Sequence, residues 1–220
     1  MGKWPLKGRF CTEWIQTIDG LLPDTDYEIM LVRANEASET VTFHTEPEAI
    51  TLNVKDFGAF GDGVHDDTSA IQAAILCCPK NARVLIPKGT YPVTALFLKS
   101  DMILELQENA VLAGIYDRAR TPILPGQIEY DNEDGYYNLG SWEGNPIDSF
   151  ASMITGIHVK NVTICGKGVL DGRADFENWW SRPKDKIRAW RPRMIFLNHC
   201  ENITVVGVTV QNSPAWNLHP

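Results

Sequence analysis

The stretch that most constrains the fold is VKDFGAFGDGVHDDTSAIQAAI, residues 54–75. Its three glycines indicate a tight, irregular path after an apolar start, because residues without a Cβ adopt backbone angles that other residues avoid. Apolar side chains from Ala70 to Ile75 then recur at i, i+1, i+4 and i+5, a spacing typical of one face of a helix. A helix this short is expected to cover a core that other segments build.

The expected helix begins near Thr68. Either Asp66 or Asp67 supplies the side-chain oxygen that caps the exposed amide groups of its first turn. Paired carboxylates also perform acid–base catalysis, but their place at the start of a helix favours a structural role.

The motif DFGAFGDGVHDDTSAIQAAI, residues 56–75, resembles the opening motif of the pectate-lyase superfamily of right-handed parallel β-helices. In that superfamily the helix covers the N-terminal mouth of the solenoid. Hydrolases, lyases and viral tailspikes share the motif, so the resemblance implies a fold and leaves the activity open. The alternative is the strand and helix of an ordinary α/β domain, but no regular βαβ alternation follows.

Composition narrows the class of partner. A formal net charge of -8 over 220 residues argues against general affinity for nucleic acid, and no apolar run reaches membrane-spanning length. The five cysteines are scattered without metal-ligand spacing, so we predict neither a metal nor a cofactor. No secretory signal follows Met1. The localisation is therefore left open: cytoplasmic if Met1 is the true start, and secreted if an N-terminal segment is missing.

Residues 1–47 are predicted to form a separate unit. Apolar and polar residues alternate over 27–32 and again over 40–45, with a polar turn from Asn35 to Ser38, which predicts a β-hairpin. The approach to Tyr27 resembles the tyrosine corner of a fibronectin type III sandwich, of which only the last strands would fit here. The alternative is a hairpin extension of the β-helix. We predict domains at 1–47 and 48–220.

After the helix, residues 82–113 contain short apolar segments divided by turn residues, which suits strands buried in a parallel coil. The hexamer that begins at Asn161 is echoed by the hexamer that begins at Asn202. Such self-similarity is typical of stacked coils. We therefore expect stacked coils in which these asparagines form a ladder at one turn. The resemblance implies that the fold is an all-β right-handed parallel β-helix with an N-terminal capping helix.

Two long segments interrupt the coils, and such interruptions often carry recognition surfaces. The first, about Thr121 to Ser149, has no Lys or Arg and is rich in aromatic residues. Its acidic residues are Glu129, Asp131, Glu133, Asp134, Glu143 and Asp148. The second, Arg173 to Arg193, carries seven basic and three acidic residues. This basic run is either a solvated loop or a contact for a polyanion, for which arginine suits carboxylates well.

Four further motifs occur in order along the chain. They are GKGVLDG (166–172), WW (179–180), RPRMIF (191–196) and NSPAWNLHP (212–220). This series resembles the polygalacturonase family, glycoside hydrolase family 28, and with the opening motif the resemblance covers residues 54–220. The WEG sequence at 142–144 agrees with bacterial members of exo-acting type.

This resemblance implies hydrolysis of α-1,4 links between galacturonic acid units with inversion. That reaction needs a carboxylic acid and a carboxylate about 6.5–9.5 Å apart, with a water between them. In the family these groups follow the Asn-Ser-Pro motif, so the catalytic residues are expected beyond Pro220. Asp171, inside GKGVLDG, is interpreted as a turn former rather than as an acid.

The resemblance also implies a pectic polysaccharide or oligogalacturonide as the partner. The candidate substrate-binding residues are His219, Trp216, Asn212, Glu143 and Arg191. Two alternatives stay open: a carbohydrate-binding β-helix without catalysis, and a pectate lyase that uses calcium held by the acidic first interruption. The sequence does not distinguish endo from exo cleavage, and it does not distinguish homogalacturonan from rhamnogalacturonan as the substrate.

These expectations predict that the purified 220-residue chain is catalytically inactive, because no catalytic carboxylate pair is identified within it. Release of reducing ends from polygalacturonate would be measured over an extended incubation. Detectable release above that of heat-inactivated protein would overturn the prediction.

Overall fold

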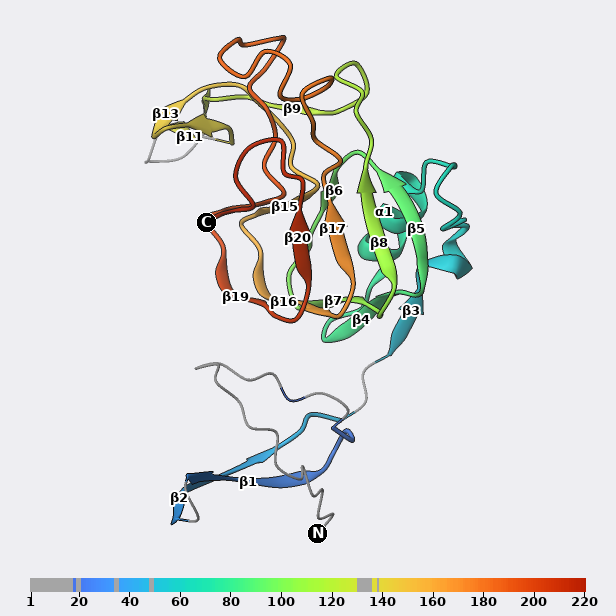
Figure 1. The fold of residues 1–220 in the computed structure, drawn as a ribbon, viewed down its shortest axis with the longest axis vertical. Coiled ribbons are helices and arrows are strands. Elements are labelled where there is room, and N and C mark those ends of the chain that lie inside the picture. The colour runs from blue at the N-terminus through green and yellow to red at the C-terminus, as the bar shows by residue number, and fades with distance from the viewer. Residues whose placement is uncertain (1–17, 19–20, 34–35, 48–49, 130–135, 138) are drawn as a thin grey trace. The chain divides into compact units, whose positions relative to one another are not determined.

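The computed structural model describes residue 18 and residues 21–33, 36–47, 50–129, 136–137 and 139–220. The chain divides into two compact units, Met1–Ala49 and Ile50–Pro220 (Figure 1). Each unit is described by itself.

The first unit contains a β-hairpin. Strand β1 (Asp26–Arg33) pairs antiparallel with β2 (Glu36–His44), and the rings of Tyr27 and Phe43 stack at 5.7 Å. The hairpin predicted from alternation is therefore present. Residues 36–38, which were expected in the turn, belong to β2, and Asn35 lies outside the described residues. The fibronectin-like assignment of residues 1–47 stays a prediction.

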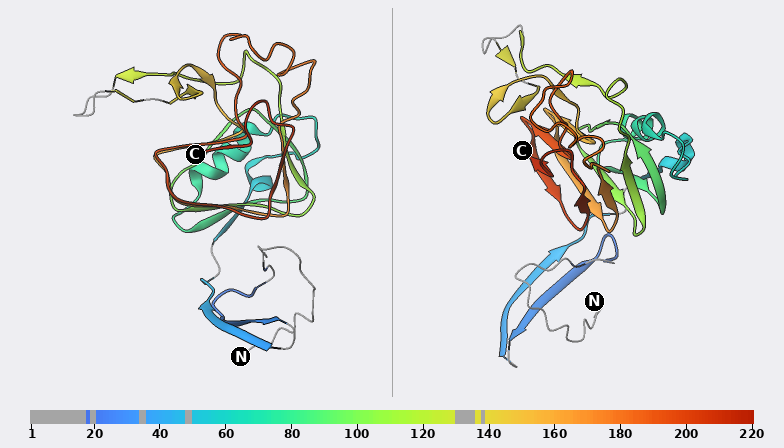
Figure 2. Two further views of the ribbon diagram at one scale, coloured as in Figure 1. Left: turned by 60° about the vertical axis from the view of Figure 1, so that its left-hand side comes forward. Right: turned by 45° about the horizontal axis from the view of Figure 1, so that its top comes forward.

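In the described part of the second unit, parallel strands form three sheets that are the sides of a β-helix (Figures 1 and 2). The first sheet contains β3 (Thr51–Asn53), β4 (Ala82–Ile86), β7 (Met102–Leu106), β16 (Lys160–Gly166) and β19 (Glu201–Val205). The second contains β5 (Gly89–Val93), β8 (Ala110–Gly114), β17 (Val169–Asp171) and β20 (Thr209–Gln211). The third contains β6 (Leu96–Phe97), β15 (Ile154–Ile157), β18 (Ile195–Asn198) and β21 (Leu218–His219).

Equivalent side chains of successive coils stack inside the helix. In the first sheet Val84 pairs with Leu104, and Leu104 pairs with Ile164 on the next coil. In the third sheet Leu96 pairs with Ile154. All five side chains are fully buried. The short apolar segments of the sequence are thus strands whose inward-facing side chains form the buried core of the coils.

A helix covers the N-terminal end of the coils, as predicted. The 3-10 helix η1 (Val54–Phe57) precedes α1 (Thr68–Cys77), which lies across the outline of the coils in the left panel of Figure 2. The buried residues of α1 are Ile71, Ala74 and Ile75, and they join the core of the β-helix. Among the described residues, no helix is long and apolar enough to cross a membrane.

The carboxylates of Asp66 and Asp67 have different structural roles. Asp66 Oδ1 accepts a hydrogen bond from the backbone N–H of Thr68 at 3.0 Å, which caps the helix. Asp67 is buried, and its two oxygens accept from the N–H groups of Phe60 and Gly61 at 2.6 and 3.0 Å. The structural interpretation of the pair is confirmed: Asp66 holds the first amide group of the helix, and Asp67, at the N-cap position without a capping side-chain hydrogen bond, anchors the glycine turn.

The predicted asparagine ladder is present at the corner before the first sheet. Asn202 Nδ2 donates to Asn161 Oδ1 at 2.9 Å, and Asn161 Nδ2 donates to Asp101 Oδ1 at 2.7 Å. These residues have φ values of 53°, 54° and 60°. Asn and Asp tolerate this left-handed conformation better than other non-glycine residues. The turn therefore favours these residue types, and the ladder provides hydrogen-bond partners for their polar side chains.

Both long insertions leave the β-helix at the corner between the second and third sheets. We call residues 115–153 the first insertion and residues 172–194 the second insertion; residues 212–217 form the same corner on the last coil. Figure 1 shows both insertions projecting from one side of the coils. The first insertion contains β9 (Ile123–Leu124), β10 (Ile128–Glu129), β11 (Tyr136–Tyr137), β12 (Ser141–Trp142), β13 (Asn145–Pro146) and β14 (Ser149–Phe150). Interruptions that are separate in the sequence are therefore neighbours.

Because the coils approach each other closely at Gly166, we predict that a substitution there strongly lowers the stability of the fold. We expect Gly166→Ala to lower the free energy of unfolding by about 3 kcal/mol or more, because φ is +109° and a Cβ would overlap the carbonyl oxygen of Leu106 on the preceding coil. Gly144→Ala is the matched control, since φ is +78° but no atom lies within 4 Å of the added Cβ. That variant should lose only about 1–2 kcal/mol. Equal urea midpoints for the two variants would contradict this account.

Candidate functional site

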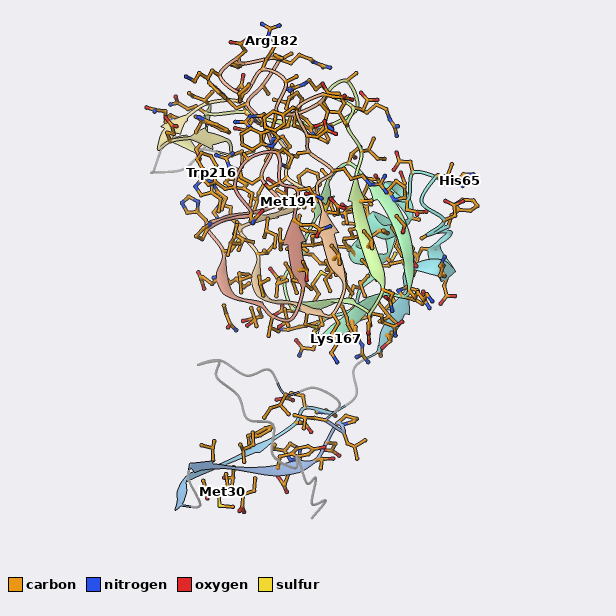
Figure 3. The ribbon with its side chains drawn as sticks, viewed as in Figure 1. Met30, His65, Lys167, Arg182, Met194 and Trp216 are labelled. Atoms are coloured by element: carbon orange, nitrogen blue, oxygen red, sulfur yellow. The ribbon has the colours of Figure 1, made fainter. Side chains whose placement is uncertain are left out.

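The corner that carries the insertions brings together tryptophans from three distant segments. Trp142 comes from the first insertion, Trp190 from the second, and Trp216 from the last coil. The rings of Trp142 and Trp190 stack at 4.7 Å and 19°, and Trp142 lies 4.8 Å from Trp216 at 52°. Trp216 is 42% exposed, and Figure 3 shows it near the C-terminal coil. We call these three residues the tryptophan cluster.

A buried arginine, Arg191, supports the cluster from the second insertion. Its guanidinium carbon lies 3.9 Å from the ring centre of Trp180 and 5.4 Å from that of Trp142. Its Nη1 donates to the carbonyl oxygen of Pro214 at 2.5 Å. Arg191 therefore joins the second insertion to the first insertion and to the last coil.

A second buried arginine, Arg193, lies among rings of three segments. Its guanidinium carbon is 5.3 Å from the ring centres of Trp216 and Phe196 and 5.6 Å from that of Trp142. One Nη2 hydrogen bond goes to the carbonyl oxygen of Ser141. Only 2% of its surface is exposed, and burial lowers the pKa of Arg193 to about 10. The side chain stays cationic at neutral pH.

Among the described residues, no acid neutralises the charges of these two arginines. Among the residues that the structure describes, neither Arg191 nor Arg193 forms an ion pair with a carboxylate, and their hydrogen-bond acceptors are neutral backbone carbonyls. The Nε atoms of both are buried without a partner in the described part of the chain. Two positive charges are thus held at low dielectric, where an uncompensated charge has a strong effect.

His219 completes the site on β21. Its ring lies 5.5 Å from Phe196 and 5.8 Å from Trp216. Burial, together with the positive charge of Arg193, lowers the pKa of His219, so the imidazole is neutral at neutral pH. Its Nδ1 is buried and has no hydrogen-bond partner among the described residues.

The structure separates the five predicted substrate-binding residues into two groups. Arg191, Trp216 and His219 lie together around the tryptophan cluster. Glu143 is exposed at the turn between β12 and β13, directly after Trp142. Asn212 is engaged elsewhere, because its Nδ2 donates to Asp171 at 2.8 Å. That all five bind substrate stays a prediction.

Sequence reasoning did not select Arg193 or Trp190. Arg191 and Arg193 are separated by one residue, and both guanidinium groups lie near the ring of Trp142. Its position two residues after Arg191 could therefore have indicated that Arg193 belongs to the same site. Trp190 had no comparable signal, since its contact with Trp142 depends on how two insertions pack.

Asp171 acts as a turn former, as predicted. Burial would raise the pKa of its carboxyl group, but hydrogen bonds from Asn212, from the backbone of Arg173 and from Gln211 together hold it below the ordinary value. The distances to these donors are 2.8, 2.9 and 3.1 Å. The ionised carboxylate of Asp171 accepts three hydrogen bonds, and this arrangement is typical of a structural role.

The basic run of the second insertion is partly paired. Arg182 Nε lies 2.7 Å from Asp185, and Lys186 Nζ lies 3.6 Å from Asp148 of the first insertion. Arg188 Nη1 donates to the carbonyl oxygen of Arg118 at 2.7 Å. The contacts of Lys186 and Arg188 hold the second insertion to the first, while a polyanion contact by the basic run stays a prediction.

The predicted alternative of a calcium site depends on the acidic first interruption. Within residues 50–129 and 139–220, and in the described parts of the first unit, no group of three His, Cys, Asp or Glu side chains could hold a metal ion. Asp131, Glu133 and Asp134 lie outside the described residues.

Comparison with known proteins identifies the family. The model of the rhamnogalacturonase A/epimerase, pectate lyase-like family matches residues 51–212. The chain belongs to this family. An exo-poly-alpha-D-galacturonosidase of Dickeya chrysanthemi is 35% identical over 208 residues, which are 90% of this chain and 32% of that protein. The chain thus spans about a third of the length of this curated relative.

Two further comparisons bear on fold and motif. A family 28 exopolygalacturonase from Yersinia enterocolitica matches with a TM-score of 0.69 and 29% identity, covering 90% of this chain and 42% of that one. The predicted right-handed parallel β-helix and the likeness to polygalacturonases are confirmed. A mannuronan C5-epimerase of Azotobacter vinelandii is 52% identical over only 64 residues, 28% of this chain and 7% of that protein.

The hydrogen bonds of Asp171 predict a pH-dependent loss of stability. We expect Asp171→Asn to lower the free energy of unfolding at pH 7 by about 1–2 kcal/mol, because hydrogen bonds to an ionised carboxylate are stronger than those to a neutral amide. The folded-state pKa lies below 3.8, so this stabilisation is present above that value and is lost as the pH falls through the folded-state pKa. The measurement is urea denaturation of wild type and variant between pH 7 and about pH 2.

Asp185→Asn is the control for this experiment. Its carboxylate pairs with the exposed Arg182, and surface pairs of this kind contribute little, so the variant should resemble wild type throughout. A deficit in Asp171→Asn that stays constant down to the lowest pH would contradict the proposed origin.

Proposed function

We propose that the protein to which this chain belongs is a pectin-degrading glycoside hydrolase of polygalacturonase type. The observation that carries the proposal is the similarity to an exo-poly-alpha-D-galacturonosidase, which extends over 90% of the chain at 35% identity. The family model matches residues 51–212, which include both insertions and so Trp142 and Trp190 of the tryptophan cluster. Fold alone would not support an activity, since unrelated activities share folds.

The reaction would be hydrolysis of α-1,4-galacturonosyl links with inversion. It requires one carboxylic acid and one carboxylate about 6.5–9.5 Å apart. The carboxylates of Asp66, Asp67 and Asp171 already hold a helix start, a glycine turn and a corner. We therefore propose that the catalytic pair comes from chain beyond residues 1–220, and that the part described here contributes to substrate binding.

The tryptophan cluster suits that role. Tryptophan offers a large and rigid face at low cost in conformational entropy, and the arginines beneath it favour an acidic ligand. We propose that Trp216, Arg191 and His219 bind the pectic chain here, with Asn212 and Glu143 at the edge of the site. The Dickeya and Yersinia relatives are named as exo-acting, so we also propose cleavage from a chain end.

The test uses the protein with all the chain that its gene encodes, incubated with polygalacturonic acid. We expect galacturonate or short oligomers of uniform size from the outset, and an anomeric configuration at first release that is opposite to that of the substrate. The Asp185→Asn variant serves as a control, because its carboxylate pairs only with the exposed Arg182 among the described residues, and it should keep the specific activity of wild type. Unsaturated products would instead indicate a lyase, and an absence of any cleavage would contradict the proposal.

A further inference from the structure

The least expected feature of the site is a pair of buried positive charges in a protein of net charge -8. Arg191 and Arg193 are 6% and 2% exposed, and their described acceptors are neutral carbonyl groups. Burial of a charge is costly unless a partner compensates it, and such a partner is usually a carboxylate. Replacement of these arginines by apolar residues would remove that cost, so their presence calls for a reason.

Packing accounts for only part of that reason. A planar guanidinium stacks well on tryptophan, and Arg193 lies 5.3 Å from the ring centre of Trp216 and 5.6 Å from that of Trp142. Stacking and a carbonyl hydrogen bond hold the segments together, but they leave the charge itself unneutralised. Arg118 adds to it, because its positive charge contributes, after burial, to the lowered pKa of Arg191.

We propose that Arg191 and Arg193 determine the preference of the tryptophan cluster for sugars that carry a carboxylate. Their charges lie beneath the rings and act through a medium of low dielectric, where fixed charges interact strongly with a ligand. A uronate stacked on the exposed face of Trp216 is attracted by this field, whereas a neutral sugar or a methyl ester gains only the stacking contact. The inference rests on the proposed function and names the origin of its selectivity.

His219 does not share this role. Its pKa is lowered by burial and by the charge of Arg193, so it is neutral at neutral pH, where the arginines are charged, and its ring lies near Phe196 and Trp216, as Arg193 does. The field at the cluster therefore comes from guanidinium groups, which do not titrate near neutral pH. Preference for the acid should consequently hold at neutral pH and above, where His219 is neutral and the ligand is ionised.

The test is calorimetric titration of the 220-residue chain with α-1,4-linked trigalacturonate and with its trimethyl ester. These ligands share their ring and linkage and differ in charge. We expect wild type to bind the acid at least about tenfold more tightly, equivalent to about 1.4 kcal/mol, and to lose this margin as salt is raised. Arg193→Met should reduce affinity for the acid about tenfold and leave affinity for the ester nearly unchanged.

Two further variants separate charge from structure. Arg193→Lys keeps the charge without the planar fork, so it should retain most of the acid preference, whereas a merely structural arginine would lose binding of both ligands. Arg182→Met removes the same charge from an exposed position at the outer tip of the second insertion, as Figure 3 shows, and should bind like wild type. Fluorescence and urea denaturation would confirm that each variant is folded.

The outcomes distinguish this inference from the proposed function. Equal binding of acid and ester by wild type, or no binding of either, would overturn the role of the arginines even if the whole protein cleaves polygalacturonate. A preference that survives Arg193→Met and Arg191→Met would do the same. Conversely, if wild type prefers the acid and these variants lose that preference, the role of the arginines would be supported even if the whole protein failed to hydrolyse the polymer.

Discussion

The whole structure depends on the in-register stacking of one coil on the next. Parallel backbone pairing places equivalent residues of successive coils side by side, so that Val84, Leu104 and Ile164 form one continuous apolar column. The coils approach so closely at Gly166 that no side chain fits there. A repeat of this kind covers the apolar surface of its neighbour, and α1 supplies the same cover at the N-terminal end.

The same register creates the candidate site. Each coil passes through the corner between the second and third sheets, so segments that are inserted at this corner on different coils become neighbours. Trp142, Trp190 and Trp216 meet for that reason, although each belongs to a different connection. The insertions are joined to each other by hydrogen bonds and by ion pairs such as that of Lys186 with Asp148. A site built in this way can change through its insertions while the coils stay constant.

The buried arginines link stability to selectivity. Arg193 contacts rings from the first insertion, from β18 and from the last coil, so it fastens three segments with one side chain. Its charge has no described acidic partner, and the cost of that burial is offset only in part by stacking and carbonyl contacts. An acidic ligand would supply the missing complement. A site that binds its ligand through an unneutralised charge is expected to be less stable when it is empty.

The sequence by itself was enough to predict the β-helix. Its short apolar strands, its asparagine ladder and its N-terminal helix each depend on residue types at particular positions along the chain. The glycine turn, the helix at Thr68 and the asparagines at 161 and 202 could be read in this way, since short-range geometry decides them. The separate roles of Asp66 and Asp67, and the cluster at the corner, were decided only by tertiary structure. Trp190 shows the reason: its contact with Trp142 joins two insertions, and no periodicity records which residues of neighbouring loops will meet.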